Sequence, residues 1–161
     1  MKLSQEMQRV VREQRLGFVA TVTADGLPNL SPKGTTRLWD DERLFFADIV
    51  SPGTVANLAT NPHVEINVVD PILRTGFRFK GTATVHTSGE MYDRGLQILR
   101  DQGSMTRPER VRSIVVIDVT EAAELVSPAY DDGATEQSIS QRWLGYYIEL
   151  HGLELPRDGG R

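Results

Sequence analysis

The stretch that decides the fold runs Phe18-Val-Ala-Thr-Val-Thr-Ala-Asp-Gly-Leu-Pro-Asn-Leu-Ser-Pro-Lys-Gly34. Its first part is rich in β-branched and aromatic residues, which predicts a buried strand over residues 16–23. Asp25-Gly26 is a strong hairpin signal, and a returning strand is expected over residues 28–38. The sheet is therefore expected to open with an antiparallel hairpin.

The remaining pattern predicts alternating strands and helices around this hairpin. Strands are expected over residues 43–48, 63–69, 77–85 and 111–119, and helices over residues 3–14, 51–61, 88–100 and 135–148. Ser51 and Ser88 are expected to cap two of these helices. Five or six strands joined mostly by hairpins indicate an α+β fold, an antiparallel β-barrel with flanking helices. We expect one domain over residues 1–151 and a flexible tail over residues 152–161.

Composition excludes several classes of protein. The chain has 161 residues and a net charge of −4, which argues against a nucleic-acid-binding protein. It has no long apolar run and no apolar signal core, so no membrane association and a cytoplasmic location are expected. It has no cysteine and only three scattered histidines, so no metal site is expected. Motifs for dinucleotide binding, nucleoside triphosphate binding and serine hydrolysis are absent.

Two Ser-Pro signals flank the strand predicted over residues 43–48. One is Ser31-Pro32-Lys33-Gly34-Thr35, and the other, where a helix should begin, is Ser51-Pro52-Gly53-Thr54. A serine N-cap followed by proline leaves backbone N–H groups that suit a phosphate, and an apolar strand beside it suits a flat ring. The pattern favours a phosphorylated planar cofactor. An ordinary capped helix is the alternative at residues 51–54.

The side chains near these signals each allow a functional and a purely structural interpretation. Ser31, Lys33 and Thr35 share one face of a strand and suit the polar edge of a flavin, but a lysine can also protect an exposed strand edge. Phe46 and Ala47 could contact a ring, or they could belong to the core. Arg74 and Arg78 could contact a phosphate, or they could lie on a solvated strand face. Similarly, Asp48 could orient a ribityl hydroxyl or cap a turn, and Trp39 and Trp143 could stack on a ring, seal a dimer or belong to the core.

Three segments together resemble the pyridoxamine 5′-phosphate oxidase-like family of FMN-binding proteins. They are the stretch over residues 18–34, the run Leu44-Phe-Phe-Ala-Asp-Ile-Val-Ser-Pro-Gly-Thr-Val-Ala-Asn-Leu-Ala-Thr-Asn-Pro-His-Val64, and Phe77-Arg-Phe-Lys-Gly-Thr-Ala83. The resemblance covers about residues 5–120. It implies a six-stranded split β-barrel that forms a two-fold homodimer, with FMN at the interface and contacted by both chains.

The resemblance also implies roles for particular positions. The isoalloxazine edge and the ribityl chain would meet Ser31, Pro32, Lys33, Gly34, Thr35 and Thr36. Phe46 and Ala47 would lie along the cofactor, and the phosphate would be bound by Ser51, Gly53 and Thr54. Gly76, with Arg74 or Phe77 nearby, would reach the partner chain's flavin.

This chain departs from the oxidase pattern in two places. The oxidase resembled here carries an Arg-Lys pair where this chain has Gly53-Thr54, so Lys33, Arg37 or Arg78 would have to supply the positive charge. Its substrate-binding C-terminal motif is missing from residues 140–161, so a substrate other than pyridoxamine phosphate is expected.

The favoured interpretation is an FMN-dependent oxidoreductase acting on an unassigned small molecule. Lys33 is the best candidate to stabilise the reduced flavin near its N1–C2 side. No general acid or base is assigned. The alternatives are an F420-dependent reductase of the same fold, and a flavin- or haem-binding protein without enzymatic activity.

Overall fold

The strands of the described residues join in one curled antiparallel sheet. The computed structural model describes residues 1–103 and 107–153. The sheet has seven strands in the order β2-β1-β5-β6-β7-β4-β3. The strands are β1 (Gly17–Val22), β2 (Pro28–Lys33), β3 (Arg37–Leu38), β4 (Arg43–Asp48), β5 (His63–Asp70), β6 (Thr75–His86) and β7 (Ser113–Val126). The expected α+β class with an antiparallel split barrel is confirmed, but the sheet has seven strands instead of six, because the strand expected over residues 28–38 is divided into β2 and β3.

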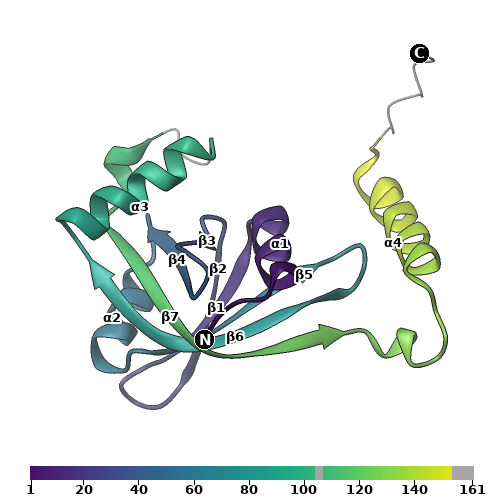
Figure 1. Ribbon diagram of the computed structural model, residues 1–161, viewed down its shortest axis with the longest axis horizontal. Helices are drawn as coiled ribbons and strands as arrows, with labels where there is room; N and C mark the ends of the chain where they lie inside the picture. Colours follow the sequence, from purple (N-terminus) through teal and green to yellow (C-terminus); the bar gives the residue numbers. More distant parts are fainter. Residues whose placement is uncertain (104–106, 154–161) are drawn as a thin grey trace.

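In the part of the chain that the structure describes, four α-helices flank this sheet. They are α1 (Gln5–Gln14), α2 (Pro52–Thr60), α3 (Glu90–Asp101) and α4 (Glu136–His151), with short 3-10 turns at Pro108–Arg110 and Pro128–Tyr130. Figure 1 shows α2 and α3 at one end of the curled sheet and α4 standing off at the other. None of the described helices is long and apolar enough to cross a membrane.

Three sequence predictions need correction. The strand expected over residues 28–38 is two strands, because the chain turns at residues 34–36, where the Thr36 amide donates to the Lys33 carbonyl at 3.2 Å. The last strand runs to Val126 instead of residue 119, because β7 continues alongside β6 beyond its apolar centre. The cap of α3 is Gly89, not Ser88; its φ of 83° is a left-handed value that serine rarely adopts. Of the tail predicted over residues 152–161, residues 154–161 lie outside the described residues.

The core lies on both faces of the strand pair β4–β7. Successive residues of a strand point to opposite faces, so Phe45 and Phe46 are both fully buried but in different clusters. Phe46 packs inside the barrel under α1, whereas Phe45 packs under α3 with Leu99 and Trp39. A fully buried side chain of this size contributes about 1.5–3 kcal/mol, so β4 is fixed firmly on both sides.

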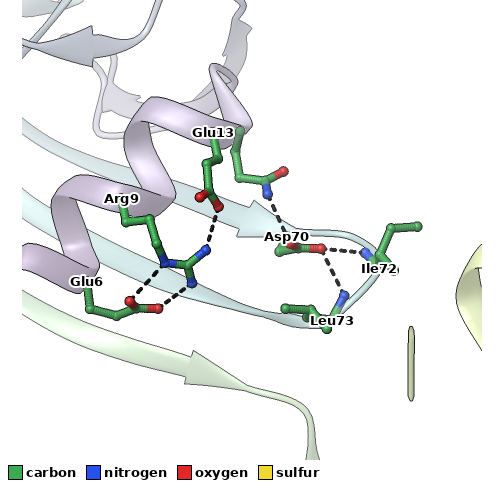
Figure 2. A network of polar contacts seen from close by, with 7 residues as sticks. Glu6, Arg9, Glu13, Asp70, Ile72 and Leu73 are labelled. Carbon is green, nitrogen blue, oxygen red and sulfur yellow. Dashed lines mark hydrogen bonds and ion pairs between the residues drawn. The ribbon is translucent and has the colours of Figure 1, made fainter. Parts of the chain in front are cut away.

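The hairpin between β5 and β6 is tied to α1 at its tip. Asp70 accepts hydrogen bonds from the backbone N–H groups of Ile72 (2.8 Å) and Leu73 (2.9 Å), and from the Gln14 amide at 3.0 Å. Figure 2 shows these bonds next to the exposed ion pairs that Arg9 makes along α1. The tip of this hairpin is therefore held in a defined position.

Candidate functional site

A buried lysine joins the two Ser-Pro segments. Lys33 ends β2, is 4% exposed, and donates hydrogen bonds of 2.6 Å to both the Ser31 hydroxyl and the Ser51 hydroxyl. Its ammonium also lies 5.7 Å from the centre of the Phe46 ring. None of the ion pairs among the described residues includes Lys33. Its positive charge is therefore held by neutral groups, without a carboxylate in direct contact.

Burial sets the charge balance at this lysine. It lowers the pKa of Lys33 below its ordinary range, and the nearby charge of Asp48 opposes that shift only in part. An anion bound next to the ammonium would favour its charged form and would recover electrostatic energy that the protein alone does not supply. The residues Ser31, Lys33, Asp48 and Ser51 are called the Lys33 cluster below.

The start of α2 faces the same cluster with open backbone donors. Ser51 is the N-cap residue as predicted, but its side chain does not cap the helix, because its hydroxyl oxygen accepts from Lys33 instead. The Ser51 amide donates to the Asp48 carboxylate at 2.7 Å. Within residues 1–103 and 107–153, the amides of Gly53 and Thr54 donate to no protein acceptor. Such free donors at a helix N-terminus attract anions.

Several hydrogen bonds tie the loop after β2, which follows directly on Lys33. The Thr35 hydroxyl accepts from the Ala47 amide at 2.9 Å, and the Thr36 hydroxyl donates to the Lys33 carbonyl at 2.9 Å. The buried Arg37 guanidinium donates to the carbonyls of Gly34 (3.2 Å) and Thr36 (2.6 Å). Burial lowers the pKa of Arg37, whose bonds hold loop carbonyls together. Arg37 therefore supports the loop rather than facing solvent.

The other residues expected along a ring system differ in accessibility. Phe46 is fully buried and Ala47 is 4% exposed, so the β4 side chains belong to the core. Thr54 is also buried, whereas Pro32, Gly34 and Gly53 are exposed. A Cβ added to Gly34 or Gly53 would meet nothing within 4 Å. Next to the Lys33 cluster, the exposed positions are therefore occupied by proline and glycine.

The residues expected on and just before β6 are separated from β2 by the strands β1 and β5. Arg74, Gly76 and Arg78 belong to the β5–β6 hairpin, whose tip lies near α4 and far from α2 in Figure 1. Arg78 pairs with Glu65 at 3.0 Å on the outer face of the sheet. Gly76 is tightly packed, because an added Cβ would come within 2.2 Å of the Val68 carbonyl oxygen. Within one chain, these residues and the Lys33 cluster do not form one site.

Arg74 has a partner that the sequence did not reveal. Its guanidinium lies 3.4 Å from the centre of the Trp143 ring, and its backbone has a φ of 57°, in the left-handed region. Trp143 is on α4, which is separated from the hairpin by all of β6 and β7. No local signal in the sequence marks this contact, since it depends on how the chain returns after β7.

A shallow hollow of about 470 Å³ lies on the outer face of the sheet. Its lining includes Ala20 and Val22 of β1, His63 and Glu65 of β5, and Lys80 of β6. None of the residues predicted to bind a cofactor lines it. In the described part of the chain, no group of three or more His, Cys, Asp or Glu residues is arranged to hold a metal ion.

The fold is that of a split barrel, in which the Lys33 cluster lies beside the free amides at the start of α2. The sequence model of the pyridoxamine 5′-phosphate oxidase family matches residues 3–125. The chain belongs to this family, as the resemblance in the sequence indicated. HupZ from Group A Streptococcus is 34% identical with a TM-score of 0.69, over 78% of this chain and 95% of that one. The uncharacterized protein MJ0282 from Methanocaldococcus jannaschii is 29% identical over 129 residues, 78% of this chain and 83% of that relative.

Structures with lower identity share the fold and differ in what they bind. An F420 reductase has a TM-score of 0.61 at 21% identity, covering 75% of this chain and 98% of that one. An FMN-binding protein from Syntrophomonas wolfei has a TM-score of 0.62 at 16% identity, covering 76% and 88%. The haem storage protein HutZ from Vibrio cholerae has a TM-score of 0.61 at 19% identity, covering 78% and 95%. At these identities the likeness concerns the fold alone.

Proposed function

We propose that this protein binds FMN through the Lys33 cluster and acts as an FMN-dependent oxidoreductase on a small molecule. The observation that carries the proposal is the buried ammonium of Lys33, which bridges two serine hydroxyls without a carboxylate in contact. A phosphate group supplies the missing anion. The membership in the pyridoxamine 5′-phosphate oxidase family supports the choice of a flavin phosphate over other phosphorylated ligands.

The donors of the cluster suit a phosphate in number and kind. Because Ser31 and Ser51 each accept from Lys33, their own hydroxyl hydrogens are free to point elsewhere. The amides of Gly53 and Thr54 add two further donors at the start of α2. Lys33 supplies the positive charge that the oxidase takes from the Arg-Lys pair absent here. We therefore assign Lys33 to the phosphate rather than to the ring.

The neighbouring loop would orient the rest of the cofactor. FMN, when bound, supplies hydride or electron transfer at its ring. The segment from Ser31 to Thr36 runs next to the cluster, and its backbone is held by the Thr35–Ala47 and Thr36–Lys33 bonds. A braced backbone of this kind fixes the cofactor's position at little further entropic cost. Proton transfer is not assigned to any side chain.

The outer face of the sheet supports a homodimer. Phe18 and Val22 on β1 and Leu30 on β2 are 40%, 36% and 66% exposed on a part of the sheet that no helix of the same chain covers. Exposed apolar strips of this kind usually mark an interface. A second copy placed there would bring the β5–β6 hairpin, with Gly76 and Arg78, toward the neighbouring cofactor. This dimer is part of the proposal.

A comparison of FMN with riboflavin tests the phosphate assignment. Riboflavin lacks the phosphate, so the wild-type protein should bind FMN at least about ten-fold more tightly, as hydrogen bonds to a charged group contribute about 1.5–3 kcal/mol. Lys33→Met should remove most of that preference. Lys2→Met is the matched control, because Lys2 is an exposed lysine paired with Asp41. Equal affinity of the wild-type protein for both flavins would refute the assignment.

F420 and haem are the second candidates, because proteins of the same fold are described as an F420 reductase and a haem storage protein. The longer anionic tail of F420 needs cations in addition to Lys33. Haem needs an accessible axial ligand, and the hollow on the sheet is lined by His63. The identity of the chromophore in the purified protein separates the three cofactors.

A further inference from the structure

The last helix carries an apolar seam that its own chain covers only at the beginning. Residues with the spacing 4-3-4 form the seam, namely Ile139, Trp143, Tyr146 and Leu150. This spacing is typical of a helix that packs lengthwise against another surface. Ile139 is 4% exposed, but Tyr146 and Leu150 are 50% and 57% exposed. The seam thus begins in an intramolecular contact and continues into solvent.

The start of α4 is anchored to the β5–β6 hairpin. Arg74 stacks on Trp143 at 3.4 Å, and the Tyr130 hydroxyl donates to the Leu73 carbonyl at 2.8 Å. The hairpin tip is itself fixed by Asp70, as Figure 2 shows. Figure 1 shows that α4 stands off from the rest of the sheet. With this anchor in place, Tyr146 and Leu150 are exposed in a single copy.

The same chain carries an exposed apolar strip that could cover the seam in a second copy. Phe18, Val22 and Leu30 form this strip on β1 and β2, at a distance from α4 in Figure 1. A chain with two separate apolar surfaces can satisfy both by exchanging them around a two-fold axis. Aromatic residues such as Tyr146 are typical anchors of such interfaces.

We propose that the exposed half of α4, with Tyr146 and Leu150, packs against a second copy of this chain as an exchanged arm. This inference rests on the dimer proposed above and adds to it a specific arm and a latch. Arg74 is the latch, since its contact with Trp143 fixes the direction in which α4 leaves the hairpin.

Sedimentation equilibrium of the full chain tests the arm. The double variant Tyr146→Ser/Leu150→Ser changes side chains that are exposed in a single copy, so the fold of each copy should persist. We expect the dissociation constant of the dimer to rise by about ten-fold or more. The control is Gln137→Ala/Gln141→Ala, which changes two exposed polar residues of the same helix and should leave the constant unchanged.

The outcomes distinguish the arm from the dimer itself. A wild-type dimer whose dissociation constant is the same in the double variant would overturn the arm and leave the dimer standing. A wild-type protein that stays monomeric would overturn both. Amide hydrogen exchange of the wild-type protein gives a second test: residues 143–151 should exchange more slowly as protein concentration rises, while α3 should not change. Concentration-independent exchange in α4 would also overturn the arm.

Discussion

Lys33 is buried beside the start of α2 and Arg74 is half-buried at the tip of the β5–β6 hairpin, and the two cations are held in different ways. Lys33 is bonded to neutral hydroxyls that can turn their hydrogens toward a ligand. Arg74 is stacked on Trp143 of its own chain. The ammonium of Lys33 has no anionic partner in direct contact and can still bind one, whereas the guanidinium of Arg74 holds α4 in place through Trp143. Whether a cation in a predicted site can bind a ligand therefore depends on the groups that it already contacts.

Gly76, near Arg74, is tightly packed, whereas Gly53, near Lys33, has free space around it. At Gly76 a Cβ would lie 2.2 Å from a backbone oxygen, whereas at Gly53 it would meet nothing within 4 Å. We expect Gly76→Ala to destabilise the protein by about 3 kcal/mol. We expect Gly53→Ala, in the first turn of α2, to be neutral or to stabilise it by up to about 1 kcal/mol. Thermal melts of both variants measure this contrast, and similar melting temperatures would contradict it.

Removal of the hydroxyls at the start of α2 tests the anion site. Ser51→Ala/Thr54→Ala should weaken FMN binding by about 1–3 kcal/mol, since hydrogen bonds to a charged group are lost. Thr60→Ala, at the exposed end of the same helix, is the control and should not change the affinity. Isothermal titration with FMN measures both. An unchanged affinity in the double variant would exclude these hydroxyls from phosphate binding.

Substitution of Arg74 should affect stability but not the cofactor. Arg74→Ala should cost about 1 kcal/mol, because the cation–π contact with Trp143 is lost. Arg74→Gly should cost less, because glycine adopts the φ of 57° without strain. Arg142→Ala is the control, as Arg142 lies 5.5 Å from the same ring centre. Melting temperatures give the stability ranking, and a large loss of FMN affinity in Arg74→Ala would show that Arg74 contacts the cofactor.

The smallest expected effect is a pH dependence from Lys33. Its pKa in the folded protein is lowered from 10.5 by burial, so the unfolded chain holds this proton more tightly. Between the folded pKa and about 10.5, the stability of the cofactor-free protein should therefore gain a contribution that rises with pH. FMN affinity should fall over the same range. Comparison with Lys33→Met isolates the effect, and identical slopes would contradict it.

Most of the fold could be predicted from local sequence patterns. The hairpin at Asp25-Gly26 and the strand over residues 43–48 are where turn chemistry and β-branched residues place them. The break at residues 34–36 was missed because it depends on tertiary hydrogen bonds from Thr36 and Arg37, which no local pattern encodes. The extension of β7 was missed because its second half pairs with β6 without an apolar pattern.

The candidate site was only partly predictable for the same reason. Ser31, Lys33 and Ser51 were all identified, but the sequence did not show that Lys33 would take the hydroxyl of Ser51 away from helix capping. That contact spans 18 positions along the chain. Arg74 and Trp143 are separated along the chain by β6 and β7, so their contact appears only in the folded structure.

The visible absorption spectrum of the freshly purified protein, with the mass of the chromophore it releases, tests FMN binding most directly. We expect flavin bands and the mass of FMN. A Soret band or the mass of F420 would contradict the choice of cofactor and leave the fold in place. A colourless protein that also fails to bind added FMN would contradict the proposed function.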